Sequence, residues 1–143
     1  MPSGSCAHIS ELPAEQLELL GSVRRGVLST VGSDDFPHSV PVVFAIIGDE
    51  IVSPIDDKPK KGPELARVRN IGSGSPATLL VDHWDEDWTK LAWVMVRGSA
   101  RVESGNAADR VLRSRYPQYE EDLTPGSRSI VLIPRRITWW SWE

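Results

Sequence analysis

The chain has 143 residues, 40% of them hydrophobic and 25% charged, which is typical of a single globular domain and excludes an intrinsically disordered tail. Its net charge of −4 argues against a general nucleic-acid binder, because such proteins are usually basic. The lone cysteine, Cys6, excludes an internal disulfide framework and a cysteine-rich zinc site.

The sequence predicts neither a secretory signal nor a membrane anchor. The first residues, MPSGSCAHIS, lack a basic n-region and an apolar h-region. No apolar run approaches the length of a membrane span. We therefore expect a cytoplasmic protein with no membrane partner, forming one domain over residues 1–143 with residues 1–10 as a flexible lead-in.

Three β-rich runs follow a short N-terminal helix that is expected to end near Gly21. The runs cover residues 26–31, 38–47 and 50–55, and the turn-forming segments GSDDFP and GD separate them. We expect these runs to form a three-stranded antiparallel meander. Pro41 lies inside the second run and cannot donate a ladder hydrogen bond, which favours an edge position, a bulge or an interrupted strand.

A lysine-rich stretch, SPIDDKPKKGPELARVRNI, occupies residues 53–71. Gly62 at an N-cap position and Pro63 at the first helical position predict that a helix begins there, with Glu64 in its first turn. Apolar residues at three-residue spacing indicate the buried face of this helix: Leu65, Val68 and Ile71.

The lysines of this stretch are Lys58, Lys60 and Lys61. They precede the predicted helix N-terminus, where free backbone N–H groups and the helix dipole also favour negative charge. Together these groups indicate an anion site, most naturally for phosphate. The alternative is an ordinary solvated lysine loop. The lysine patch is positive although the whole chain carries a negative net charge, and this contrast favours the anion site.

Further strands are expected in the second half of the chain, at residues 77–84, 91–102, 129–133 and 137–142. The last two are predicted to form one strand that continues past Pro134. Residues 91–102 alternate between two faces, and Gly98 within them indicates a bend or a bulge.

A helix is expected over residues 107–116, with Val111 and Leu112 pointing inward, and a polar turn region over residues 117–127. The tally is six or seven strands in antiparallel order with two or three short helices. Adjacent strands joined by short turns favour a mainly β fold, a closed or nearly closed barrel.

No side chain can be identified as catalytic from the sequence. The chain has no nucleophile elbow, phosphate-binding loop or zinc-protease motif. The three histidines are far apart and lack metal-ligand spacing, and the acidic loop after Asp82 is better explained as a solvated loop than as a cation site. We therefore predict no metal site. If the protein is an enzyme, a bound cofactor carries the chemistry and the chain supplies orientation and electrostatics.

The six tryptophans fall into two groups, and core packing is the simplest explanation for each. One group surrounds a single loop and the other ends the chain: Trp84, Trp88 and Trp93, and Trp139, Trp140 and Trp142. Three indoles in the last five residues would expose a large apolar area on a monomer. They are therefore expected to cover a barrel end, a subunit interface or a planar ligand.

Three motifs together resemble the pyridoxamine 5′-phosphate oxidase-like superfamily of flavin- and deazaflavin-binding split β-barrels: LSTVGSDDFPHSVPVVF, SPIDDKPKKGPELARVRNI and LLVDHWDEDWTKLAWVMVRGSARV. The likeness covers residues 20–140. Within this superfamily the sequence most resembles the mycobacterial and actinobacterial coenzyme F420-dependent oxidoreductases, and the run VDHWDEDW together with DDKPKK is more specific than either run alone. The resemblance implies a mainly β, FMN-binding-like split barrel of antiparallel strands that forms a homodimer with two cofactor sites at the interface.

The resemblance also implies which residues bind the cofactor. The phosphate would be held by Ser53 and the lysines: Lys58, Lys60 and Lys61. The ring would lie near Pro41, Val42 and Val43, with Ile55 beneath it and backbone groups bonding the pyrimidine edge. Trp84 or Trp88, from the same or the partner subunit, would line the site. Many relatives have Arg or Thr after the lysines, where this chain has Gly62 and Pro63.

The implied activity is that of an oxidoreductase that moves a hydride between reduced F420 and an unsaturated small molecule. The same barrel with FMN, acting as an oxidase or reductase, is the near alternative, because lysines serve either phosphate. A non-catalytic protein that holds a flavin or deazaflavin is an alternative from another class. A structural dimer with a vestigial site is the third.

Overall fold

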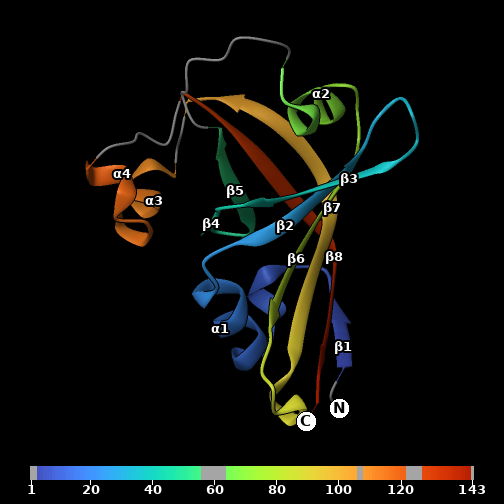
Figure 1. Ribbon diagram of the computed structural model, residues 1–143, viewed down its shortest axis with the longest axis vertical. Coiled ribbons are helices and arrows are strands. Elements are labelled where there is room, and N and C mark those ends of the chain that lie inside the picture. Colours follow the sequence, from blue (N-terminus) through green and yellow to red (C-terminus); the bar gives the residue numbers. More distant parts are fainter. Residues whose placement is uncertain (1–2, 56–63, 106–107, 122–126, 143) are drawn as a thin grey trace.

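The computed structural model describes residues 3–55, 64–105, 108–121 and 127–142, and these residues form one curled antiparallel sheet with short helices around it (Figure 1). The strands are β1 (Ser3–Cys6), β2 (Gly26–Val31), β3 (Pro37–Val42), β4 (Ala45–Ile47), β5 (Glu50–Ile55), β6 (Ala77–His83), β7 (Ala92–Ser104) and β8 (Arg128–Ser141). The α-helices are α1 (Ala14–Ser22), α2 (Ala66–Gly72), α3 (Asp109–Arg115) and α4 (Gln118–Glu121), with 3₁₀ turns η1 (Ile9–Glu11) and η2 (Trp88–Lys90). The predicted mainly β, antiparallel fold class is confirmed.

The strand order is β3-β2-β6-β7-β8-β5-β4, with β1 added to β8. The two strands at the ends of this order, β3 and β4, are consecutive in the chain and are joined by Val43 and Phe44 alone. Three Cα–Cα steps span at most about 11 Å, so the two ends of the sheet must lie close together. The sheet therefore curls back on itself as a barrel.

The predicted three-stranded meander is wrong. β2 pairs with β3 and β4 pairs with β5, but among the described residues β3 and β4 do not pair. The strand breaks at Val43 and Phe44 because side chains bind the backbone there. The Ser53 hydroxyl donates to the Val43 carbonyl oxygen at 2.8 Å. The Tyr116 hydroxyl accepts from the Phe44 N–H at 3.3 Å and donates to its carbonyl oxygen at 3.2 Å.

The long β7 and β8 strands form the central ribbon of the barrel, and their alternate residues build the core. Val94 and Val96 on β7 and Ile137 on β8 are fully buried, as the alternation in residues 91–102 predicts. The register between the two strands shifts between Arg97 and Gly98, which confirms the predicted irregularity. A Cβ at Gly98 would overlap the backbone carbonyl of Ile133, so the close approach of the strands requires glycine.

The N-terminal segment is not the flexible lead-in that the sequence predicted. Ser3–Cys6 pairs with β8, placing Cys6 opposite Ile137. Asp49, in the turn before β5, binds the residues that follow β1. Its carboxylate accepts from the Ile9 N–H at 2.6 Å and contacts the His8 Nδ1 at 2.8 Å. Backbone pairing and one carboxylate thus order a segment without an apolar pattern.

Helix α2 begins at Ala66, after Leu65, and not at Pro63 as predicted. Gly62 and Pro63 lie outside the described residues. Glu64, which was expected in the first helical turn, lies outside the helix, and its carboxylate binds the guanidinium of Arg128 on β8. The predicted buried face is correct, since all three of its residues pack in the main core: Leu65, Val68 and Ile71.

A second, smaller core joins α3 and α4 to the outer side of β4, β5 and β8. Leu112 is fully buried there, as predicted, but Val111 is 40% exposed and points outward. Residues 118–121, expected to be turn, form α4. Within the described parts of the chain, no helix has both the length and the apolarity needed to cross a membrane.

Candidate cofactor site

The predicted cofactor residues on β3 and β5 come together where the sheet closes. Ser53 is buried, and its hydroxyl bond to Val43 links β5 to the segment after β3. Val42 and Ile55 are both buried in the main core cluster. The bond from Ser53 uses the hydroxyl proton that a phosphate contact would need. In this geometry Ser53 therefore orients the Val43 backbone.

β3 offers backbone groups to a ligand. Among the described residues it pairs only with β2, so one row of its N–H and C=O groups meets no strand. Pro41 is exposed and Val43 half-buried on this edge, while Val42 points into the core. The edge position of Pro41 agrees with its missing N–H. A flat edge of this kind fits the expected polar edge of a flavin-type ring.

Trp84 and Trp88 lie far from these residues within one chain. Ile55 pairs with Arg128 at the start of β8, whereas Ala92, the partner of His83, pairs with Ser141 at its end. The thirteen residue steps between Arg128 and Ser141 measure on the order of 40 Å along the curved strand. One chain therefore does not bring the two predicted tryptophans to the Ser53 region.

The loop that carries these tryptophans is held by its own carboxylates. The Asp87 carboxylate accepts from the backbone N–H and the hydroxyl of Thr89 at 3.1 and 2.7 Å, and Asp85 accepts from the Asp87 N–H at 2.8 Å. Trp84 and Trp88 are 60% and 59% exposed and meet edge to face with ring centroids 6.3 Å apart. The loop thus presents two ordered indoles to solvent. No group of three or more His, Cys, Asp or Glu in the described ranges is arranged to hold a metal.

Lys58, Lys60 and Lys61 lie outside the described residues, but the residues on either side of that segment are fixed. Ile55 pairs with Arg128 in the ladder between β5 and β8. Glu64 receives two hydrogen bonds of 3.1 Å from the Arg128 guanidinium. Both flanks of the lysine segment therefore converge on one arginine. Sequence reasoning missed Arg128, because 64 residues separate it from its carboxylate partner.

Two further polar residues near α2 were also missed as site candidates. His38 on β3 and Arg69 on α2 line a cavity of about 190 Å³ together with Asn70. The Arg69 guanidinium donates to the Glu64 carbonyl oxygen at 2.9 Å. The Nδ1 atom of His38 is buried and has no hydrogen-bond partner among the described residues. The one available signal was the position of His38 at the start of a strand.

The bulged, curled antiparallel sheet with its edges joined at Val43 and Phe44 defines a split β-barrel protein. The chain belongs to the pyridoxamine 5′-phosphate oxidase family, whose profile matches residues 12–141. No curated protein matches the chain.

Solved structures share the fold at low sequence identity. A conserved hypothetical protein from Mycobacterium tuberculosis is 20% identical with a TM-score of 0.70, covering 92% of this chain and 86% of that one. An FAD binding protein from Mycobacterium smegmatis is 24% identical with a TM-score of 0.56, covering 90% and 93%. A heme binding protein from Mycobacterium smegmatis is 20% identical with a TM-score of 0.65, covering 90% and 54%.

Proposed function

We propose that this protein is an F420-dependent oxidoreductase, which moves a hydride between reduced F420 and an unsaturated small molecule. Membership of the pyridoxamine 5′-phosphate oxidase family supports an oxidoreductase or flavin-binding role. An FAD-binding protein among the structural neighbours supports a flavin-type ligand. The choice of F420 over FMN rests on the resemblance of the whole chain to the F420-dependent class.

One observation carries the proposal: the Ser53 hydroxyl bond to Val43 joins the two sequence segments predicted to hold the ring. Pro41 and Val43 then present the unpaired edge of β3, and Ile55 closes the buried side. When bound, the cofactor supplies the carbon that donates or accepts the hydride. The chain binds and orients it, and no described side chain is proposed as a proton donor.

We propose that Lys58, Lys60 and Lys61 hold the cofactor phosphate. The support is the anchoring of Ile55 and Glu64, the described residues on either side of their segment, on Arg128. Lysine ammonium groups act as point charges toward phosphate, so they serve F420 and FMN alike. FMN-dependent oxidase or reductase activity is therefore the main alternative within the same site.

We further propose a homodimer in which Trp84 and Trp88 line the cofactor site of the partner subunit. The support is their exposure and ordered loop, together with their distance from Ser53 in one chain. The alternative, a non-catalytic protein that binds a flavin or deazaflavin, uses the same binding site but catalyses no hydride transfer. The location in the cytoplasm stays a prediction.

The first experiment titrates the apo protein with F420 and with FMN in parallel, monitoring tryptophan quenching and cofactor fluorescence. Tight F420 binding, followed by oxidation of reduced F420 in a panel of enone acceptors, would support the proposal. Tight FMN binding with weak F420 binding would instead support the FMN-dependent alternative. Binding of F420 without turnover on any acceptor would favour the carrier alternative.

Lysine variants test the phosphate contacts. The variant with Lys58, Lys60 and Lys61 all changed to Ala should bind the cofactor at least about tenfold more weakly, because it loses charge-assisted bonds to phosphate. Arg110→Ala is the control, since it removes an exposed cation on α3 that the proposed site does not use. Equal affinity in both variants would refute the phosphate site.

A further inference from the structure

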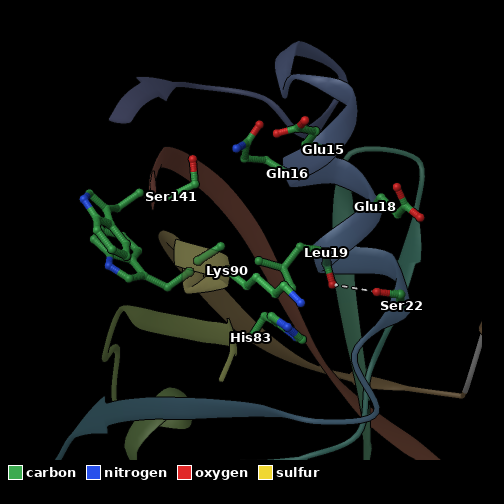
Figure 2. A pocket seen from close by; sticks show the side chains of 11 residues that line it. Glu15, Gln16, Glu18, Leu19, Ser22, His83, Lys90 and Ser141 are labelled. Atoms are coloured by element: carbon green, nitrogen blue, oxygen red, sulfur yellow. Dashed lines mark hydrogen bonds between the residues drawn. The ribbon is translucent and has the colours of Figure 1, made fainter. Parts of the chain in front are cut away.

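A second cavity lies between α1 and the far ends of β6, β7 and β8, at the end of the sheet opposite Ser53 (Figure 2). Its volume is about 270 Å³. Side chains from α1 form one wall, and residues of the strands and of η2 form the other. Neither the predicted cofactor residues nor the family resemblance accounts for this cavity.

Gln16 on α1 lines the cavity and is only 8% exposed. Its side-chain amide makes no hydrogen bond to any described residue, and Figure 2 shows it on the α1 wall beside Glu15. The residue is nearly buried, but its amide atoms still reach solvent through the cavity, because they are not among the fully buried polar atoms without a partner. A ligand in the cavity would therefore meet two free N–H donors and a free carbonyl oxygen.

The strand wall is aromatic. Trp93 on β7 lies directly opposite Trp140 on β8, and both indoles line the cavity. Directly opposite residues of an antiparallel pair project from the same face, so the two rings form one surface. Leu19 from α1 and Ala92 from β7 add apolar contacts. This surface fits a planar aromatic group, which gains from stacking as well as from burial.

The charges around the cavity are separated by sign. Glu15 and Glu18 come from α1, while Lys90 and His83 come from η2 and the end of β6. Within the part of the chain that the structure describes, Glu15, Glu18 and Lys90 enter no ion pair within 4.0 Å. His83 has only a distant contact with Asp85, at 3.9 Å. The opposite walls thus offer unneutralised charges of opposite sign.

We infer that this cavity is a binding site for a small aromatic zwitterion of the size of an aromatic amino acid. Its ring lies on Trp93 and Trp140, its ammonium faces the α1 carboxylates, and its carboxylate faces Lys90. The Gln16 amide completes the hydrogen bonding. A molecule with a single charge would find an opposite charge on one wall only, so a zwitterion should bind more tightly than either singly charged analogue.

The probe for this site is L-phenylalanine, compared with phenylacetate and phenethylamine, which each keep one of its two charges. Calorimetric titration of the full-length apo protein should give binding of L-phenylalanine, with both analogues about tenfold weaker or more. In ¹⁵N spectra the indole signals of Trp93 and Trp140 should shift, while those of Trp84 and Trp88 stay in place. No binding at millimolar L-phenylalanine, or shifts only at Trp84 and Trp88, would overturn the inference.

Two variants test whether Gln16 and Lys90 bind a ligand or serve only in packing. Gln16→Leu should lose about tenfold or more in affinity while its melting temperature is unchanged or higher, because the amide has no protein partner to lose. Gln118→Leu is the control, since Gln118 is the only other glutamine and is exposed on α4. Lys90→Gln, an exposed change, tests the charge requirement independently of folding. Unchanged L-phenylalanine affinity in Gln16→Leu or in Lys90→Gln would refute the assignment.

Discussion

The guanidinium of Arg128 binds the carboxylate of Glu64 through two hydrogen bonds of 3.1 Å each. The same arginine pairs with Ile55 in the β5–β8 ladder. Ile55 precedes the lysine segment and Glu64 follows it. One residue of β8 therefore fixes both flanks of the segment that carries the proposed phosphate contacts.

Arg128→Gln should lower cofactor affinity by about three- to tenfold, because it frees Glu64, which must then be ordered on binding. The stability change should stay below about 1 kcal/mol, since the ion pair is partly exposed. Fluorescence titration and urea unfolding measure the two effects. Arg101→Gln is the control, because it breaks exposed ion pairs with Glu50 and Glu103. A similar loss of affinity in both variants would contradict the role of Arg128.

Ser53→Ala should destabilise the protein by about 1–2 kcal/mol, because it leaves the partly buried Val43 carbonyl without its donor. Cofactor affinity should fall as well, since the Val43 backbone loses its support. Urea unfolding checks the first effect and titration the second. Ser29→Ala, which removes an exposed hydroxyl bond to Ser39, should change neither. A Ser53→Ala variant with full cofactor affinity would show that the link is not needed for binding.

Gly98→Ala should be among the most damaging small substitutions, with a cost of about 3 kcal/mol or more, because its methyl group would collide with backbone of Ile133. Gly21→Ala is the matched control on α1, where a methyl group meets nothing within 4 Å. It should stabilise the helix by about 0.5–1 kcal/mol. Chemical denaturation of the pair measures both. Equal stability of the two variants would mean that the strands can separate at Gly98 without cost.

The anchoring of the N-terminal strand should depend on pH. The hydrogen bond and charge of Asp49 raise the pKa of His8. Partial burial opposes ionisation of Asp49, but its bonds to His8, Ile9 and Ser10 lower the pKa of its carboxyl overall. The stability that protonated His8 adds to the N-terminal strand is therefore fully present below about pH 6.5, the ordinary histidine pKa. This stability is lost as the pH rises through the raised pKa. The stability that ionised Asp49 adds is fully present above about pH 3.9, the ordinary aspartate pKa, and is lost as the pH falls through the lowered pKa.

Hydrogen exchange of the Ser3–Cys6 amides measures this dependence, after correction for the intrinsic exchange rate at each pH. Protection should be greatest between the two limits and should fall on the alkaline side. In His8→Asn the alkaline decrease should disappear. Persistence of that decrease in the variant would assign the pH dependence to another group.

Local patterns in the sequence predicted the strands well. The predicted runs 26–31 and 50–55 have the bounds of β2 and β5, because turn-forming residues flank a β-rich run in each case. The alternation in residues 91–102 and the irregularity at Gly98 were also correct. These features depend on neighbouring residues alone, which explains why a single sequence was sufficient.

Features set by distant contacts could not be predicted. β3 and β4 separate because Tyr116 and Ser53 bind the backbone between them, and no local pattern shows those bonds. β1 forms on the template of β8, so Ser3–Cys6 carries no strand signal of its own. The bond between Glu64 and Arg128 joins residues 64 positions apart, so no local pattern shows it either.

The same division applies to the candidate site. The motifs brought attention to Ser53 and Pro41, and the fold places their segments together. Arg128 and the cavity beside Gln16 depend on tertiary packing, and single-sequence reasoning missed both. The pairing of Trp93 with Trp140 likewise requires the β7–β8 register.

The two-residue link at Val43 and Phe44 leaves a seam in the barrel wall. Each strand that borders the seam has a neighbour on one side only among the described residues, so local opening should begin there and not in the β7–β8 ribbon. A ligand bound along β3 would stabilise this part of the barrel against local opening. Ligand binding would then slow amide hydrogen exchange in Pro37–Val42, and this slowing would detect the bound ligand before any turnover is measured.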